Sequence, residues 1–155
     1  MSYTDADEVA TRLFVGSKPP PGAHPQYDAI VLAAIEYQPP ANLFPGTEVI
    51  HAPFDDAPGR LMSHDEIVTA TKAAARVARR LRAGRRVLVT CAMGLNRSGL
   101  IAALAMHDVY GMSADEIIKR LRRARGAWAL SNPNFEKLLR VVISVKQTPA
   151  PVSAH

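Results

Sequence analysis

The sequence predicts an α/β fold with a central, mostly parallel sheet of about four to five strands flanked by helices. Three observations lead to this prediction. Short strand-like segments occupy the first third of the chain, and helical patterns lie between and after them. One uninterrupted apolar run, RRVLVT, is typical of a central strand that is buried on both faces. The length of 155 residues suits one domain with one hydrophobic core.

Four segments are expected to form strands. Each is rich in β-branched or aliphatic residues and is bounded by turn-forming residues such as Gly, Pro or Asp. The segments cover residues 12–16, 27–33, 48–52 and 85–90. The last of them contains the apolar run that predicts the central strand.

The first two helices are expected from the spacing of apolar residues and from capping signals. One covers about 63–83, begins with a capping box formed by Ser63 and Glu66, and ends at Gly84. The other covers about 97–110 and is apolar nearly all round, which predicts a buried helix.

Two further helices complete the expected fold. The third covers about 114–125 and begins with a capping box at Ser113, and the fourth begins at Asn132 with a proline at its first helical position. We expect one domain over residues 1–146 and a disordered tail over 147–155. Five basic residues crowd the end of the third helix, where the helix dipole favours cations, and we interpret them as solvent-exposed. They are Lys119, Arg120, Arg122, Arg123 and Arg125.

Composition limits the class of protein. Hydrophobic residues make up 48% of the chain, which is too many for a disordered protein, and no apolar run approaches the roughly 20 residues that span a bilayer. The first residues lack the pattern of a secretory signal, and a single Cys cannot form an internal disulfide. We therefore expect a cytoplasmic protein without membrane insertion. The net charge of +5 favours anionic partners such as phosphates, nucleic acid or acidic lipid.

The stretch VLVTCAMGLNRSG, residues 87–99, places the only cysteine between the expected central strand and the second helix. Ligands of α/β sheets bind outside the carboxyl ends of strands, and here backbone N–H groups and the positive end of a helix can converge on one point. Gly94 permits the turn. The sequence therefore predicts a cradle for a tetrahedral anion. Its residues are Ala92, Met93, Gly94, Leu95, Asn96 and Arg97.

The residue types in this loop predict attack on phosphorus. Arg97 adds a planar fork that can bind two phosphate oxygens. The positive field of the cradle stabilises a thiolate at Cys91, which would form a cysteinyl-phosphate intermediate, and Ser98 could donate a hydrogen bond when that thiolate leaves. The alternative is that Cys91 is only a small buried hydrophobic residue.

Other phosphate and metal motifs fit less well. A P-loop NTPase needs a Lys where this chain has Leu100. The chain has no C-x-x-C or H-E-x-x-H motif, so we expect no metal site and no cofactor.

The pattern C-x5-R followed by Ser, formed by Cys91, Arg97 and Ser98, resembles the signature of cysteine-dependent protein tyrosine phosphatases. The segments LFVGS, GMSADEIIKRLRRAR and SNPNFEKLL resemble the dual-specificity branch, and the similarity covers about residues 12–143. The resemblance implies a dual-specificity phosphatase-like fold. It also implies removal of phosphate from phosphotyrosine in proteins, with phosphoserine and phosphothreonine left open.

The resemblance also implies a general acid. The family uses an aspartate on a loop ahead of the signature, and alignment on Pro53 in IHAPFDDAPG selects Asp56, with Asp55 as the alternative. One departure concerns Thr90, because the family usually has His before the Cys. A Thr hydroxyl could still hydrogen-bond into the loop, but it carries no positive charge.

Three alternatives to a protein phosphatase remain open. GLNRSG is also similar to the signature of RNA 5′-triphosphatases of the same superfamily, and the basic residues near 119–125 would suit a polyanion. Phosphoinositides are another possible substrate class. The third alternative is a weakly active phospho-binding module, of which Thr90 would be a sign. We prefer a phosphorylated protein as the partner and consider nucleic acid less favoured.

Overall fold

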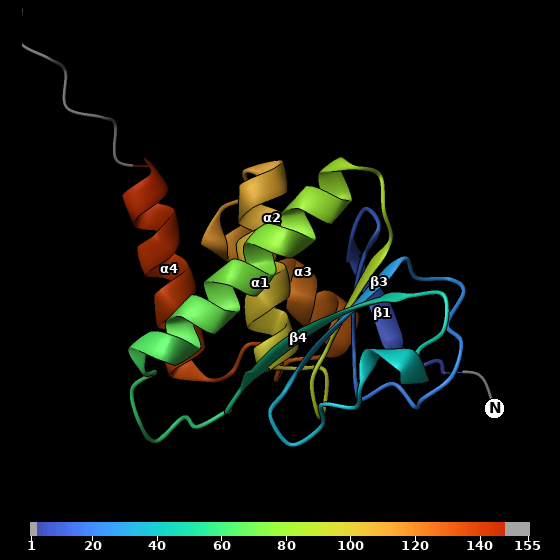
Figure 1. Cartoon of the computed structure of the whole chain (residues 1–155). Helices are drawn as coiled ribbons and strands as arrows, with labels where there is room; N and C mark the ends of the chain where they lie inside the picture. The colour runs from blue at the N-terminus through green and yellow to red at the C-terminus, as the bar shows by residue number, and fades with distance from the viewer. Residues whose placement is uncertain (1–2, 148–155) are drawn as a thin grey trace, which may run out of the picture.

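A computed structural model describes residues 3–147, in which five strands form one sheet beside four α-helices (Figure 1). The strands are β1 (Ala6–Ala10), β2 (Leu13–Gly16), β3 (Ala29–Ala34), β4 (Glu48–Phe54) and β5 (Val87–Thr90). The helices are α1 (His64–Arg82), α2 (Arg97–Tyr110), α3 (Ala114–Arg125) and α4 (Pro133–Gln147), and a short 3₁₀ helix, η1, covers Ala41–Leu43. The α/β prediction is confirmed.

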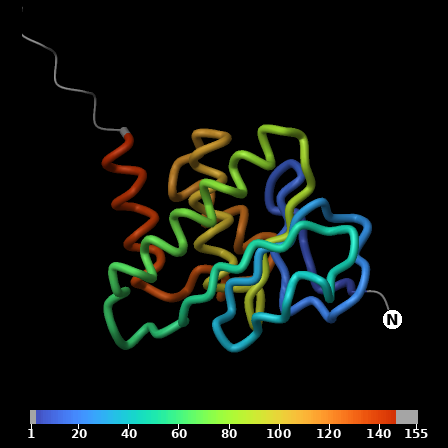
Figure 2. The backbone as a smooth tube through the Cα atoms, in the orientation of Figure 1, coloured from blue at the N-terminus to red at the C-terminus, as the bar shows by residue number. Residues whose placement is uncertain are grey.

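The sheet has the order β1-β2-β5-β3-β4. Only β1 runs antiparallel to its neighbour, so the sheet is mostly parallel with β5 at its centre, as the apolar run predicted. The parallel strands β2, β3, β4 and β5 therefore end at the same edge. In Figure 2 the turns that follow β3 and β5 lie together at the lower edge of the molecule.

The two faces of the sheet bury different clusters, because side chains alternate along each strand. Val31 and Val89 face the cluster that the helices complete, whereas Ile30 and Leu88 face a smaller cluster that includes Phe44. The four helices gather on the first face in Figure 1. Helix α2 is buried on nearly all sides, as its sequence predicted.

Most element boundaries agree with the sequence predictions to within two residues, and the exceptions are informative. The capping box at Ser63 is complete, whereas at Ser113 only the serine half forms, because Glu116 accepts a hydrogen bond from Arg120 instead. Helix α4 includes Gln147, which we had placed in the tail, and residues 148–155 lie outside the described part of the chain. Within residues 3–147, no helix is both long and apolar enough to span a bilayer.

Candidate active site

The loop after β5 turns at a position that only glycine can occupy. Cys91 N donates a hydrogen bond to Gly16 O (3.3 Å), which ties the start of the loop to the end of β2. Gly94 then adopts a φ of 69°, in the left-handed region. A Cβ atom at Gly94 would lie 2.6 Å from the carbonyl carbon of Gly16, so the glycine permits both the turn and the close approach of the two backbones.

Arg125, at the end of α3, orients two peptide groups of the cradle. Its Nη2 donates to Met93 O (3.0 Å) and its Nε donates to Gly94 O (3.0 Å). In a planar trans peptide the carbonyl and the next N–H point in opposite directions. Holding these carbonyls outside the loop therefore turns the N–H groups of Gly94 and Leu95 inward. We had interpreted Arg125 as solvent-exposed, and this was wrong, since its side chain is only 6% exposed.

Hydrogen bonds from outside the loop also orient its last part, Leu95 and Asn96. Leu95 O accepts a hydrogen bond from Leu130 N (3.0 Å), so the N–H of Asn96 points away from that contact. Asn96 precedes α2 but its side chain makes no capping hydrogen bond to the helix. It bonds to the loop before α4 instead, through Asn132 N (2.8 Å). The side chain of Asn96 thus leaves the N-terminal amides of α2 open to an anion.

Cys91 and Ser98 meet at the base of this loop. Cys91 Sγ lies 3.2 Å from Ser98 Oγ, a hydrogen bond in which either atom can be the donor. Ser98 is fully buried and Cys91 is 3% exposed. The sulfur also interacts electrostatically with the Arg97 guanidinium. Cys91 therefore lies among polar and cationic groups as well as beside the apolar core.

Glu36 fixes the guanidinium of Arg97. Arg97 Nη1 and Nη2 donate to the two Glu36 carboxylate oxygens at 2.7 and 2.6 Å, and Nη1 also contacts Phe54 O (3.2 Å). These hydrogen bonds lower the pKa of Glu36 to about 2. Burial is the largest influence on the pKa of Arg97 and acts to lower it, but the hydrogen bonds with Glu36 and the nearby negative charges together outweigh burial, so the pKa is raised.

One nitrogen of the Arg97 guanidinium has no hydrogen-bond partner among the described residues. Its Nε is buried, and no described residue accepts a hydrogen bond from it. A buried donor without a partner costs about 1–3 kcal/mol. Since the side chain is only 7% exposed, an acceptor supplied by a ligand would remove that cost.

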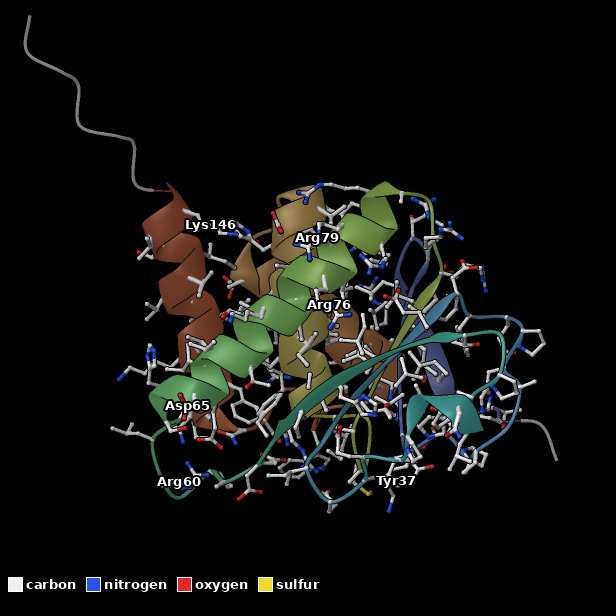
Figure 3. The ribbon with its side chains drawn as sticks, in the orientation of Figure 1. Tyr37, Arg60, Asp65, Arg76, Arg79 and Lys146 are labelled. Carbon is white, nitrogen blue, oxygen red and sulfur yellow. The ribbon has the colours of Figure 1, made fainter. Side chains whose placement is uncertain are left out.

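The two candidate acids lie in different surroundings. Asp56 Oδ1 accepts a hydrogen bond from Asn132 Nδ2 (2.7 Å), and the Asp56 charge acts on Arg97. The side chain of Asp55 is 55% exposed, and its carboxylate accepts from Asp56 N (2.8 Å) and lies 3.8 Å from Arg60. Arg97 thus interacts with the charge of Asp56, while Asp55 is largely open to solvent. Figure 3 labels Arg60 at the lower edge of the molecule.

Thr90 does not support the loop in the way we had considered. Its hydroxyl donates to Val31 O (2.7 Å) on the neighbouring strand β3, and its side chain is buried between the strands. Among residues 3–147, no group of three or more His, Cys, Asp or Glu side chains is arranged to hold a metal ion.

Sequence reasoning missed three residues of the site. Glu36 lies two positions after the end of β3, so the rule that ligands bind at the carboxyl ends of strands could have suggested it. Asn132 had been interpreted only as a helix cap. Arg125 carries no local signal, because its partners in the loop precede it by about 30 residues.

Comparison with known proteins supports the fold. No protein-family model matches the sequence, and no curated protein matches it. Human DUSP28 superposes with a TM-score of 0.77 at 24% identity, covering 94% of this chain and 97% of that one. Tk-PTP in its active form gives 0.73 at 21%, covering 92% and 98%. The human tyrosine phosphatase-like serine/threonine/tyrosine-interacting protein gives 0.68 at 17%, covering 91% and 97%. This chain therefore has the fold of the dual-specificity and tyrosine phosphatases.

Proposed function

We propose that the protein is a cysteine-dependent phosphatase that removes phosphate from phosphotyrosine in proteins. The observation that carries this proposal is the buried Nε of Arg97, which has no partner among the described residues and belongs to the same loop as the thiol. A phosphate oxygen supplies the acceptor that this donor needs. The inward N–H groups and the start of α2 supply the remaining positive field.

The chemistry follows in two steps. The Cys91 thiolate attacks phosphorus, the bond from phosphorus to the substrate oxygen breaks, and Asp56 gives that oxygen a proton. Asp56 then takes a proton from water, whose oxygen attacks phosphorus while the S–P bond breaks. Ser98, 3.2 Å from the sulfur, donates a hydrogen bond to the departing thiolate. Inorganic phosphate leaves and the thiolate is restored.

The charges near the site favour a phosphoprotein over a polyanion. The arginines at the end of α3 are largely paired, with Arg120 bonded to Glu116 and Arg125 bonded to the loop and to two aspartates. This pairing reduces the positive charge that the end of α3 offers to an RNA triphosphate or a phosphoinositide. By contrast, Met93 in the cradle and Ile35 beside Glu36 are exposed apolar side chains, which suit an aromatic ring.

A phospho-binding module is the second candidate, and Thr90 favours it. Its hydroxyl is engaged by β3, so the residue before the cysteine contributes neither charge nor a hydrogen bond to the loop. One structural neighbour is itself described as a phosphatase-like interacting protein. Such a module would retain the cradle but turn over slowly.

Turnover assays separate these functions. We expect wild type to hydrolyse p-nitrophenyl phosphate and a phosphotyrosyl peptide, and Cys91→Ser to be inactive on both. Asp56→Asn should lose about 10²–10⁴-fold in rate on the phosphotyrosyl peptide, whose leaving group needs a proton. Asp55→Asn should stay within a few-fold of wild type. Peptide binding without turnover would establish the binding module. Faster hydrolysis of 5′-triphosphorylated RNA or of a phosphoinositide would reassign the substrate.

A further inference from the structure

We infer that Asn132 is a positioning residue, whose side-chain amide orients the Asp56 carboxylate. It thereby links the loop between β4 and α1, which carries Asp56 and is called the acid loop below, to the phosphate cradle. This inference rests on the proposed function, because it assumes that Asp56 is the general acid. Nothing in the sequence motifs assigns Asn132 this role, since its place before a proline suggested only a helix cap.

Asn132 is 2% exposed and contacts three separate parts of the site. Its backbone N–H donates to Asn96 Oδ1 (2.8 Å), which belongs to the cradle. Its side-chain Nδ2 donates to Asp56 Oδ1 (2.7 Å). Its side-chain Oδ1 accepts from Asn134 N (3.0 Å) and so caps the first turn of α4. The residue is fixed by two of these contacts and acts on Asp56 through the third.

The acid loop depends on this region of the chain for its position. The loop crosses from the end of β4 to the start of α1, and Asn134 Nδ2 donates to the backbone oxygens of Pro58 (3.2 Å) and Arg60 (2.6 Å). Asn134 therefore holds the backbone of the loop. Asn132 is the residue that holds the carboxylate itself.

An amide is well suited to this task. Its N–H group donates a hydrogen bond to one carboxylate oxygen but does not ionise at neutral pH. It therefore orients Asp56 without taking part in the proton transfer itself. The other oxygen stays free to exchange a proton with the substrate. A misplacement of a catalytic group by about 1 Å can cost about 10²-fold in rate, so fixing one carboxylate oxygen of Asp56 has a large effect on the rate.

The contact with Asn96 gives the arrangement a second consequence. Asn96 is part of the loop that holds phosphate, and Asn132 is part of the segment that holds the acid. Because one short chain of hydrogen bonds joins Asn96, Asn132 and Asp56, the acid and the cradle keep a fixed relation to each other. The same chain of hydrogen bonds therefore positions both the proton donor and the loop that binds phosphate.

Asn132→Ser is the discriminating variant. Serine caps a helix about as well as asparagine, but its hydroxyl is too short to replace the amide at Asp56. We expect kcat/KM to fall about 10- to 100-fold with phenyl phosphate, whose leaving group needs a proton, and only a few-fold with p-nitrophenyl phosphate, whose leaving group does not. In an Asp56→Asn background the same substitution should change the phenyl phosphate rate less than two-fold.

A matched control accounts for loss of stability. Ser113→Ala removes the N-cap of α3, which is exposed and outside the site, and should cost about 1 kcal/mol without altering the ratio between the two substrates. Equal losses on both substrates in Asn132→Ser, or additive losses with Asp56→Asn, would show a merely structural role and overturn the inference while leaving the phosphatase intact. If wild type hydrolyses neither substrate, both proposals fail together.

Discussion

Replacing Arg125 by Met tests whether the cradle is held open from outside. The guanidinium makes four strong hydrogen bonds, to Met93 O and Gly94 O at 3.0 Å each, and to the carboxylates of Asp5 (2.9 Å) and Asp7 (3.0 Å). The substitution removes all four, and the two freed loop carbonyls no longer fix the peptide planes that follow them.

The magnitude follows from these contacts. Hydrogen bonds from a charged group contribute about 1.5–3 kcal/mol each. However, Asp5 and Asp7 are 60% and 49% exposed, so hydrogen bonds to water replace most of the stabilisation that these two carboxylates lose. A net loss of about 3 kcal/mol lowers Tm by about 6–12 °C in a chain of this length. Since each fixed donor to a developing anion contributes about 10²–10³-fold, we expect kcat to fall by at least about 10²-fold.

The assay combines stability, binding and turnover. Calorimetry gives Tm, titration with tungstate as a phosphate mimic gives the affinity of the cradle, and p-nitrophenyl phosphate gives the rate. Arg123→Met is the matched control, because Arg123 is exposed near the same end of α3 and should behave as wild type. Wild-type tungstate affinity and turnover in Arg125→Met would refute the role of Arg125 in orienting the loop.

Three further outcomes are expected. Glu36→Gln should lower kcat/KM for p-nitrophenyl phosphate about 10- to 100-fold, since Arg97 loses its bidentate partner; normal rates would contradict this. Because hydrogen bonds from Arg97 lower the pKa of Glu36 to about 2 from 4.5, this carboxylate stabilises the fold above pH 4.5 and loses that contribution as pH falls toward 2. Allowing for solvent screening, this is about 1 kcal/mol, so Tm should fall less steeply between pH 5 and 3 in Glu36→Gln than in wild type. Gly94→Ala should abolish tungstate binding and lower Tm, because its φ of 69° and its contact with Gly16 exclude a Cβ; retained binding would show that the loop can rearrange.

Sequence reasoning was most accurate where local and tertiary preferences agree. Helix α1 begins after Ser63 because its capping box satisfies the first amides, and α2 has the predicted bounds because an apolar segment follows the tight loop. The central strand β5 was recognisable because both of its faces are buried. At these places the local sequence pattern and the tertiary contacts favour the same conformation.

Strand β1 and the residues that hold the loop containing Cys91 depend on long-range contacts, which no local sequence pattern indicates. Strand β1, ADEVA, has two acidic residues and poor strand propensity, and it forms because β2 offers it an edge to pair with. The loop containing Cys91 was identified from its spacing. The residues that hold this loop in place were not identified, since Glu36 and Arg125 come from segments far away in the chain. Residue types alone could not show which of many charged side chains would be buried.

The bridge from Asp5 and Asp7 to Arg125 has a practical meaning for anyone who produces this protein. The first strand looks dispensable, since it lies at the edge of the sheet and about 120 positions from its partner. Yet trimming the chain to start at β2 would remove the two carboxylates that pair with Arg125 beside the loop containing Cys91. In a shortened variant, or in one with a bulky amino-terminal fusion, the loop containing Cys91 would then be less well ordered because of where the chain was cut or extended.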